Sequence, residues 1–157
     1  TALTAPGQPV KAVRQKRKVE MSKYAIAYGL AAVLFGALDA VWLNWAGPNL
    51  YQPIIGEIMA EDINLCAAGA FYFLYLAGMV WFAIRPGLQS GRATTALANG
   101  AWLGGLCYAT FDLTRQAVFK VWATQITLLD IFWGAFATGT TSAIVTAATL
   151  RLTSSKI

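Results

Sequence analysis

The stretch ITLLDIFWGAF (residues 126–136) places one aspartate, Asp130, in the middle of an otherwise apolar run. Two further stretches repeat the pattern, FGALDAVWL around Asp39 and CYATFDLTR around Asp112. An ionisable side chain inside such a segment is rare and usually faces other protein segments or a polar cavity. The aspartates therefore predict that these segments pack against one another with their carboxyl groups turned inward.

The composition places most of the chain in lipid. Its 157 residues are 57% hydrophobic and only 12% charged, whereas a soluble domain carries about 25% charged residues. Residues 24–45, 63–84, 93–115 and 124–150 each reach the roughly 20 residues that cross a hydrocarbon core. Because backbone groups in lipid must bond within their own segment, each is predicted to be a helix. We therefore expect an all-α polytopic membrane protein, with four transmembrane helices packed as a bundle within residues 21–157.

The predicted connections differ in length. RPGLQSGR (residues 85–92) is predicted to be a turn, because Pro86 and two glycines interrupt a helix. The longer connection AGPNLYQPIIGEIMAED (residues 46–62) contains a short amphipathic stretch after Pro53. That stretch is expected to lie along the membrane interface.

Basic residues are distributed unequally between the two ends of the predicted spans. Most lie with the termini or beside the second connection: Lys11, Arg14, Lys16, Arg17, Lys18, Lys23, Arg85, Arg92, Arg151 and Lys156. Only Arg115 and Lys120 fall on the other side, where Glu57, Glu61 and Asp62 also lie. Since basic residues favour the cytoplasmic side, or the matrix or stroma, both termini are expected there.

Helical spacing indicates which faces pack. The predicted packing glycines are Gly36, Gly100, Gly104 and Gly134. Gly100 and Gly104 form a GxxxG pair that lets helices approach closely in lipid. Residues four apart share a helix face, so Asp130 shares one with Gly134. Asp112 lies eight residues after Gly104 and therefore shares a face with it. Asp39 is expected on the flank of the small-residue face that contains Gly36.

A polar intramembrane cluster is predicted around these carboxyl groups. Its members are Asp39, Asn64, Tyr72, Tyr75, Tyr108, Asp112, Arg115 and Asp130. In one interpretation the cluster holds the fold together, with tyrosine, Thr114 or tryptophan donors on the aspartates and Arg115 as the ion partner of Asp112. In another it lines a pocket, open to the outer side, for a small polar or head-group ligand; a proton relay is the third. The carboxyl groups cannot all stay ionised in a low-dielectric site, so at least one is expected to hold or share a proton.

The sequence lacks residues that several common kinds of functional site require. The sequence contains no histidine, the commonest metal ligand and usual haem ligand. We therefore expect no metal site and no pigment or haem ligation, and no cofactor other than bound lipid. Phosphate loops, Ser-His-Asp sets and zinc-protease motifs are also missing, which makes an enzyme the less favoured class. Cys66 and Cys107 are predicted to be small buried residues, with a disulfide as the alternative.

Residues 1–20 form a basic polar extension with three open interpretations. Met21 is the original start, or Thr1 is the end left by removal of a transit peptide, or the first residues are a remnant of the expression vector. The run KAVRQKRK is expected to meet anionic lipid or an acidic protein rather than nucleic acid. Ordering the extension costs roughly 1–2 kcal/mol of backbone entropy per residue, more than its cations gain at about 1 kcal/mol each from lipid. Thr1 to Lys18 are therefore expected to contact another membrane-protein subunit.

Motifs along the chain resemble a known family. They are LDAVWL (residues 38–43), AAGAFYFLYLAGMVWFAIRP (67–86), GLCYATFDLT (105–114) and LLDIFWG (128–134). In this order they resemble small bacterial-type integral membrane proteins catalogued as domain of unknown function 2177, over about residues 24–150. The resemblance implies a four-span fold and little chemistry. The positions it carries over are Asp39, Trp42, Tyr51, Tyr72, Tyr75, Pro86, Tyr108, Asp112, Thr114, Trp122, Asp130 and Trp133.

Two functions fit the sequence. The first is a non-catalytic accessory subunit of a larger respiratory or photosynthetic membrane complex, tethered by the N-terminal extension. The alternative is a small transporter or lipid-handling membrane enzyme that uses the outward-facing aspartate pocket. The expected location is a bacterial inner membrane, a mitochondrial inner membrane or a thylakoid membrane.

Overall fold

The computed structural model describes residues 10–154, with side chains described for residues 20–153. All regular elements in this part of the chain are helical, so the prediction of an all-α fold is confirmed. The predicted contacts of residues 1–18 lie outside the described side chains. The elements are α1 (Val10–Ala46), the π-helical turn η1 (Gly47–Tyr51), α2 (Gln52–Ile55), the 3₁₀ turn η2 (Gly56–Ile58), α3 (Leu65–Met79), the π-helical turn η3 (Val80–Ile84), α4 (Arg85–Ser90), α5 (Ala93–Val118) and α6 (Thr124–Ser154).

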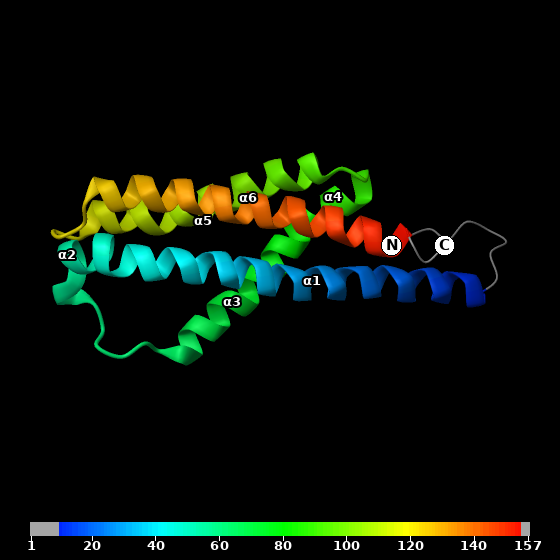
Figure 1. Cartoon of the computed structure of the whole chain (residues 1–157), viewed down its shortest axis with the longest axis horizontal. Coiled ribbons are helices and arrows are strands. Elements are labelled where there is room, and N and C mark those ends of the chain that lie inside the picture. Colours follow the sequence, from blue (N-terminus) through cyan, green and yellow to red (C-terminus); the bar gives the residue numbers. More distant parts are fainter. Residues whose placement is uncertain (1–9, 155–157) are drawn as a thin grey trace.

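The long helices α1, α5 and α6 run along the long axis of the molecule, whereas α3 crosses them at a steep tilt (Figure 1). The start of α1 and the end of α6 lie at the same end. The opposite end carries α2 and the connection between α5 and α6. α5 packs chiefly against α6, and α1 packs against α6 and η3.

Helices of membrane-spanning length account for most of the described chain. Within residues 10–154, three helical segments are long and apolar enough to cross a membrane: Glu20–Ile58, Leu65–Ser90 and Thr124–Thr153. The helix α5 is continuous over 26 residues, but polar side chains such as Asn99 and Asp112 interrupt its apolar sequence. A helix rises about 1.5 Å per residue, so α5 is also long enough to cross a hydrocarbon core.

The second of these helical segments continues through Pro86 to Ser90, so the predicted turn over residues 85–92 is wrong for most of its length. Pro86 has no N–H to donate to the carbonyl four residues earlier, and its ring crowds that carbonyl. The preceding residues Val80–Ile84 widen into a π-helical turn, a common way for a helix to accommodate such a break. The chain reverses at Gly91, whose φ of 67° lies in the left-handed region that glycine adopts readily.

The helices α5 and α6 approach so closely that only glycine fits at their contact. A Cβ atom on Gly104 would lie 1.9 Å from the backbone oxygen of Gly134. One on Gly100 would lie 2.8 Å from the backbone oxygen of Thr138. On the other side, the ring of Tyr108 occupies the space beside Gly134. In lipid such contacts between small residues replace the hydrophobic effect as the main attraction between helices.

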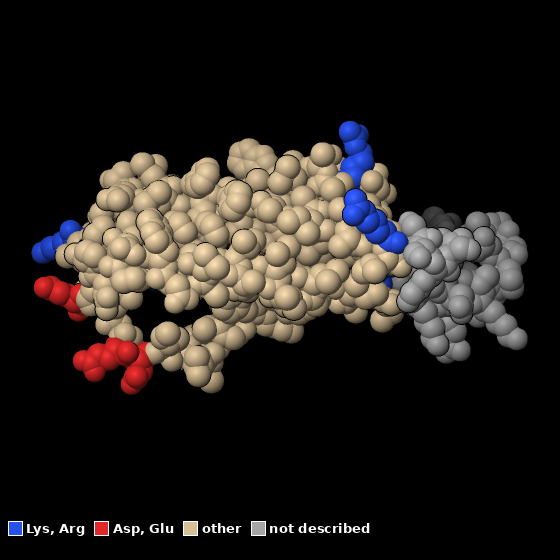
Figure 2. All heavy atoms as spheres, viewed as in Figure 1, with Lys and Arg blue, Asp and Glu red and all other residues tan. Residues whose placement is uncertain are grey.

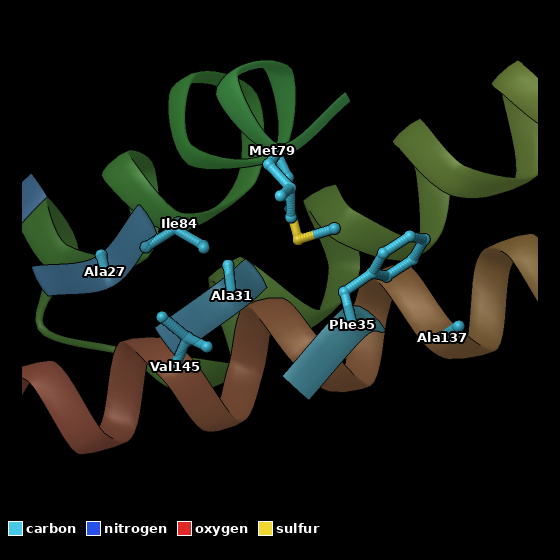
Figure 3. Packing of buried hydrophobic residues seen from close by; sticks show 8 residues of the cluster. Ala27, Ala31, Phe35, Met79, Ile84, Ala137 and Val145 are labelled. Atoms are coloured by element: carbon cyan, nitrogen blue, oxygen red, sulfur yellow. The ribbon is translucent and has the colours of Figure 1, made fainter. Parts of the chain in front are cut away.

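The packing face of α1 differs from the predicted one. Ala27, Ala31 and Phe35 are fully buried and point toward α6 and the helix formed by α3 and η3, next to Met79 (Figure 3). A Cβ atom added at Gly36, the predicted packing glycine, would have no other atom within 4 Å. The packing face of α1 is therefore shifted by one residue from the predicted face. It is formed by Phe35 and alanines rather than by Gly36. Asp39, four residues after Phe35, lies on this face and not on its flank.

We predict that Gly104→Ala destabilises the bundle by about 1–3 kcal/mol, as overpacking of a tight contact does. The matched control is Gly105→Ala, whose added Cβ would make an ordinary contact of 3.6 Å with Ala135. Since alanine favours a helix by about 1 kcal/mol over glycine, the control is expected to be neutral or stabilising. Thermal unfolding in detergent, followed by circular dichroism, measures both variants. Equal melting temperatures for the two variants would show that the helices do not depend on this contact.

Candidate functional site

A cavity of about 590 Å³ lies between α1, α3, α5 and the first turns of α6, beside the chain that joins α2 to α3. Figure 2 shows an open gap between that connection and the body of the helices. We call this cavity the aspartate pocket. Its lining is formed by Asp39, Trp42, Leu43, Tyr51, Ile55, Ile58, Met59, Ala68, Phe71, Tyr72, Tyr75, Cys107, Tyr108, Phe111, Arg115, Trp122 and Asp130.

The wall formed by α1 and α3 carries a carboxyl–tyrosine pair. Asp39 is only 5% exposed, and its Oδ2 accepts a hydrogen bond from the hydroxyl of Tyr72. The tilt of α3 brings Tyr72 against α1, where its ring also packs edge-on against Phe35. This hydrogen bond therefore ties the tilted helix to α1 at the edge of the pocket.

The wall formed by α6 carries a second carboxyl–tyrosine pair. The Tyr51 hydroxyl, in the π-helical turn η1, donates a hydrogen bond of 2.6 Å to Oδ1 of Asp130. The indole N–H of Trp42 donates to the same hydroxyl at 3.1 Å, and the Trp42 ring stacks on Trp133 with 4.7 Å between centroids. Residue spacing did not single out Tyr51, because it lies in a connection. Only the family resemblance pointed to it.

Asp112 is fully buried. Asp130 lines the pocket, but Asp112 does not. Neither of its carboxyl oxygens accepts a hydrogen bond from an N–H or hydroxyl donor of the described residues. Asp130 and Arg115 are charged side chains close enough to influence Asp112 electrostatically. The predicted donors, Arg115 or a tyrosine, do not reach it. Its neighbour Asp130 can form a hydrogen bond with it only if one of the two carboxyl groups carries a proton.

Arg115 faces aromatic rings, so the predicted ion pair with Asp112 is wrong. Its guanidinium carbon lies 4.1 Å from the ring centroid of Phe111, and 5.6 Å and 5.9 Å from those of Phe119 and Trp122. Asp112 is on the face of α5 that packs against α6, whereas Arg115 reaches the rim of the pocket. A guanidinium over aromatic faces is stabilised by the ring electrons without a carboxylate partner.

Two other members of the predicted cluster lie at the pocket. Tyr75 shares a hydrogen bond of 2.7 Å with the hydroxyl of Thr138 on α6. Tyr108 lines the pocket with its ring against Gly134. With Asp39, Tyr72, Asp112, Arg115 and Asp130, they show that residues from distant parts of the sequence meet in one place.

Asn64 and Thr114 are not part of the site. Asn64 is exposed at the start of α3, where its side chain caps the helix by accepting a hydrogen bond from the N–H of Ala67 at 3.1 Å. The Thr114 hydroxyl donates to the backbone oxygen of Thr110, at 2.5 Å, rather than to an aspartate. Both residues satisfy local backbone groups, a common role for short polar side chains in helices.

Both cysteines are free and exposed, so the predicted burial is wrong and they form no disulfide with each other. Cys107 lines the aspartate pocket, whereas Cys66 lies in the first turn of α3. Among the described residues, no group of three histidine, cysteine or acidic side chains is placed to hold a metal ion.

The sequence was also compared with known proteins. Neither curated proteins nor solved structures give a match. A family model described as "Predicted membrane protein (DUF2177)" matches residues 24–147. The match includes Asp39, Asp112 and Asp130 and the helices that bring them together. The chain therefore belongs to this family of predicted membrane proteins, whose function is unknown.

Proposed function

We propose that the chain is a four-span membrane protein that binds a small amphipathic ligand in the aspartate pocket, as a transporter or lipid-handling protein. The observation that carries the proposal is a cavity of about 590 Å³ in which hydrophobic walls surround a few polar groups. Ligand pockets in proteins commonly measure about 300–1,000 Å³ and combine an apolar lining with a few orienting polar groups.

The polar groups keep hydrogen-bonding capacity for a ligand. Asp39 and Asp130 line the pocket, and each receives one hydroxyl hydrogen bond, from Tyr72 and Tyr51 respectively. An ionised carboxylate offers roughly four acceptor positions. The remaining positions suit the head group of a ligand, while residues such as Phe71 suit its apolar part.

The same cavity favours ligand binding over a purely structural role for the cluster. The space is open at one side, so a molecule can enter it and reach the carboxyl groups. A cluster that only tied the helices together would need no such accessible space. The role of accessory subunit stays a prediction, because its tether, residues 1–18, lies outside the described side chains.

The proposed topology has α5 as the fourth span, with the pocket near the outer side. In Figure 2 acidic side chains gather at the end that carries α2, and basic side chains mainly at the opposite end. The visible face between the two ends shows neither, as suits a surface in contact with lipid. The basic end would face the cytoplasm, matrix or stroma and the acidic end the opposite side. Such an arrangement fits a bacterial inner membrane or an energy-transducing organelle membrane.

We predict that Arg92→Cys and Lys120→Cys, which flank α5, are labelled from opposite sides of the membrane. The measurement uses a membrane-impermeant maleimide on sealed vesicles, in a background where Cys66 and Cys107 are replaced by serine. Gln52→Cys is the reference for the acidic side. Labelling of the residue-92 and residue-120 cysteines from one side would mean that α5 does not cross. Labelling of the residue-52 and residue-92 cysteines from one side would contradict the proposed orientation.

We predict that Ala68→Trp abolishes retention of the native ligand, because Ala68 lines the pocket and an indole would fill it. The matched control is Ala70→Trp, which adds the same side chain to an exposed position on α3 outside the lining. Native mass spectrometry of protein extracted in mild detergent measures any small amphiphile that stays bound. The proposal fails if wild-type protein retains none, or if the two variants retain equal amounts.

A further inference from the structure

We propose that the ligand of the aspartate pocket carries a cationic head group and that the buried pair Asp112 and Asp130 releases a proton when this cation binds. The inference rests on the proposed function and names the chemistry of the ligand. It follows from the charges at the pocket, from the burial of Asp112 and from the partners of both carboxyl groups.

The charges around the pocket favour a cation. Asp39 and Asp130 line it, and Asp112 is buried beside Asp130. Among the described residues of the lining, Arg115 alone is basic. The guanidinium of Arg115 already lies over Phe111. Acidic groups are therefore in excess at the pocket.

The aromatic walls add to this preference. Phe71, Phe111, Trp42 and Trp122 line the same space. Faces of aromatic rings attract organic cations, most strongly where water is excluded. A molecule with an apolar body and an ammonium or phosphonium group fits both the walls and the acidic groups.

The buried pair lacks a positive partner of its own. Asp112 is fully buried, and neither of its oxygens has an N–H or hydroxyl donor among the described residues. Asp130 receives one hydrogen bond, from the neutral hydroxyl of Tyr51 on η1. An uncompensated carboxylate in an apolar interior is too costly to persist, and the group takes up a proton instead. The empty site is therefore expected to hold one proton between the two carboxyl groups.

Among the residues whose side chains are described, the neighbouring elements supply no basic group that bonds to the pair. The charge on α1 is a further carboxyl group, Asp39, which is paired with Tyr72 of α3. From α5, Tyr108 presents a neutral ring beside Gly134, and Arg115 acts on Asp112 only through space. A cation that enters the pocket and contacts Asp130 can supply the missing charge.

The exchange step balances without a co-reactant. The ligand cation approaches Asp130, the O–H bond between the pair and its proton breaks, and the proton passes to water at the pocket opening. The site loses one positive charge as a proton and gains one as the ligand. No group is oxidised or reduced, and no covalent bond to the ligand forms.

The test uses tetraphenylphosphonium as the probe and tetraphenylborate as a control of the same shape and opposite charge. Equilibrium dialysis of the full chain in mild detergent measures binding, and a pH indicator in weak buffer measures proton release. Wild-type protein is expected to bind the phosphonium, to release one proton for each ion bound, and to bind tetraphenylborate at least about tenfold more weakly. For one-for-one exchange the dissociation constant falls about tenfold for each unit rise in pH.

Substitutions separate the two carboxyl groups. Asp112→Asn has an amide that can donate to Asp130 at every pH, so this variant is expected to bind the phosphonium without releasing a proton. Asp130→Asn is expected to bind it at least about tenfold more weakly, a loss of about 1.4 kcal/mol. Asp62→Asn, in the exposed connection before α3, is the matched control and leaves both measurements unchanged.

Wild-type measurements decide the proposal even if a variant does not fold. Phosphonium binding without proton release, or equal binding of the borate, overturns the exchange. Absence of phosphonium binding in a protein that retains its native amphiphile, and loses it in Ala68→Trp, overturns only the cationic ligand and leaves the proposed function standing. Failure of the Ala68→Trp and Ala70→Trp comparison instead overturns the proposed function.

Discussion

The contact between Gly104 and Gly134 is the constraint on which the rest of the site depends. In lipid, helices gain little from hiding apolar side chains, so α5 and α6 associate through the close approach that glycines allow. This approach buries Asp112 and brings it to Asp130. The absence of a side chain at Gly134 also leaves room for the ring of Tyr108, which lines the pocket. A bulkier residue at either glycine would separate the carboxyl groups as well as the helices.

The tilt of α3 and the π-helical turn η1 place two tyrosines against the carboxyl groups of the pocket. The helix α3 is tilted against α1, α5 and α6, and the span that it begins reaches Pro86 through a π-helical turn. A second π-helical turn at the end of α1 carries Tyr51 to Asp130. Hydrogen bonds from Tyr51 on this turn and from Tyr72 on the tilted but regular helix α3 hold Asp130 and Asp39 at the pocket. The pocket thus combines a rigid contact between α5 and α6 with a tilted α3.

The distribution of positive charge distinguishes the interpretations of the aspartates. A structural cluster would pair each carboxyl group with a donor or a cation, and Asp39 does have such a donor in Tyr72. Asp112 does not, because Arg115 lies over aromatic rings at the rim. A buried carboxyl group beside another, next to an aromatic cavity, is an arrangement suited to exchanging one cation for another.

The sequence by itself determined the helical class, the membrane environment and the glycines between α5 and α6, since hydrophobic length and spacing of four residues follow directly from helix geometry. The family resemblance also pointed to eight of the seventeen residues that line the pocket, among them both of its aspartates. Only the tertiary structure decided that Arg115 turns away from Asp112, that α1 packs through Phe35 rather than Gly36, and that the helix continues past Pro86. These outcomes depend on helix rotation, tilt and local widening. Such features are set by contacts between segments distant in sequence, which the spacing within one segment does not encode.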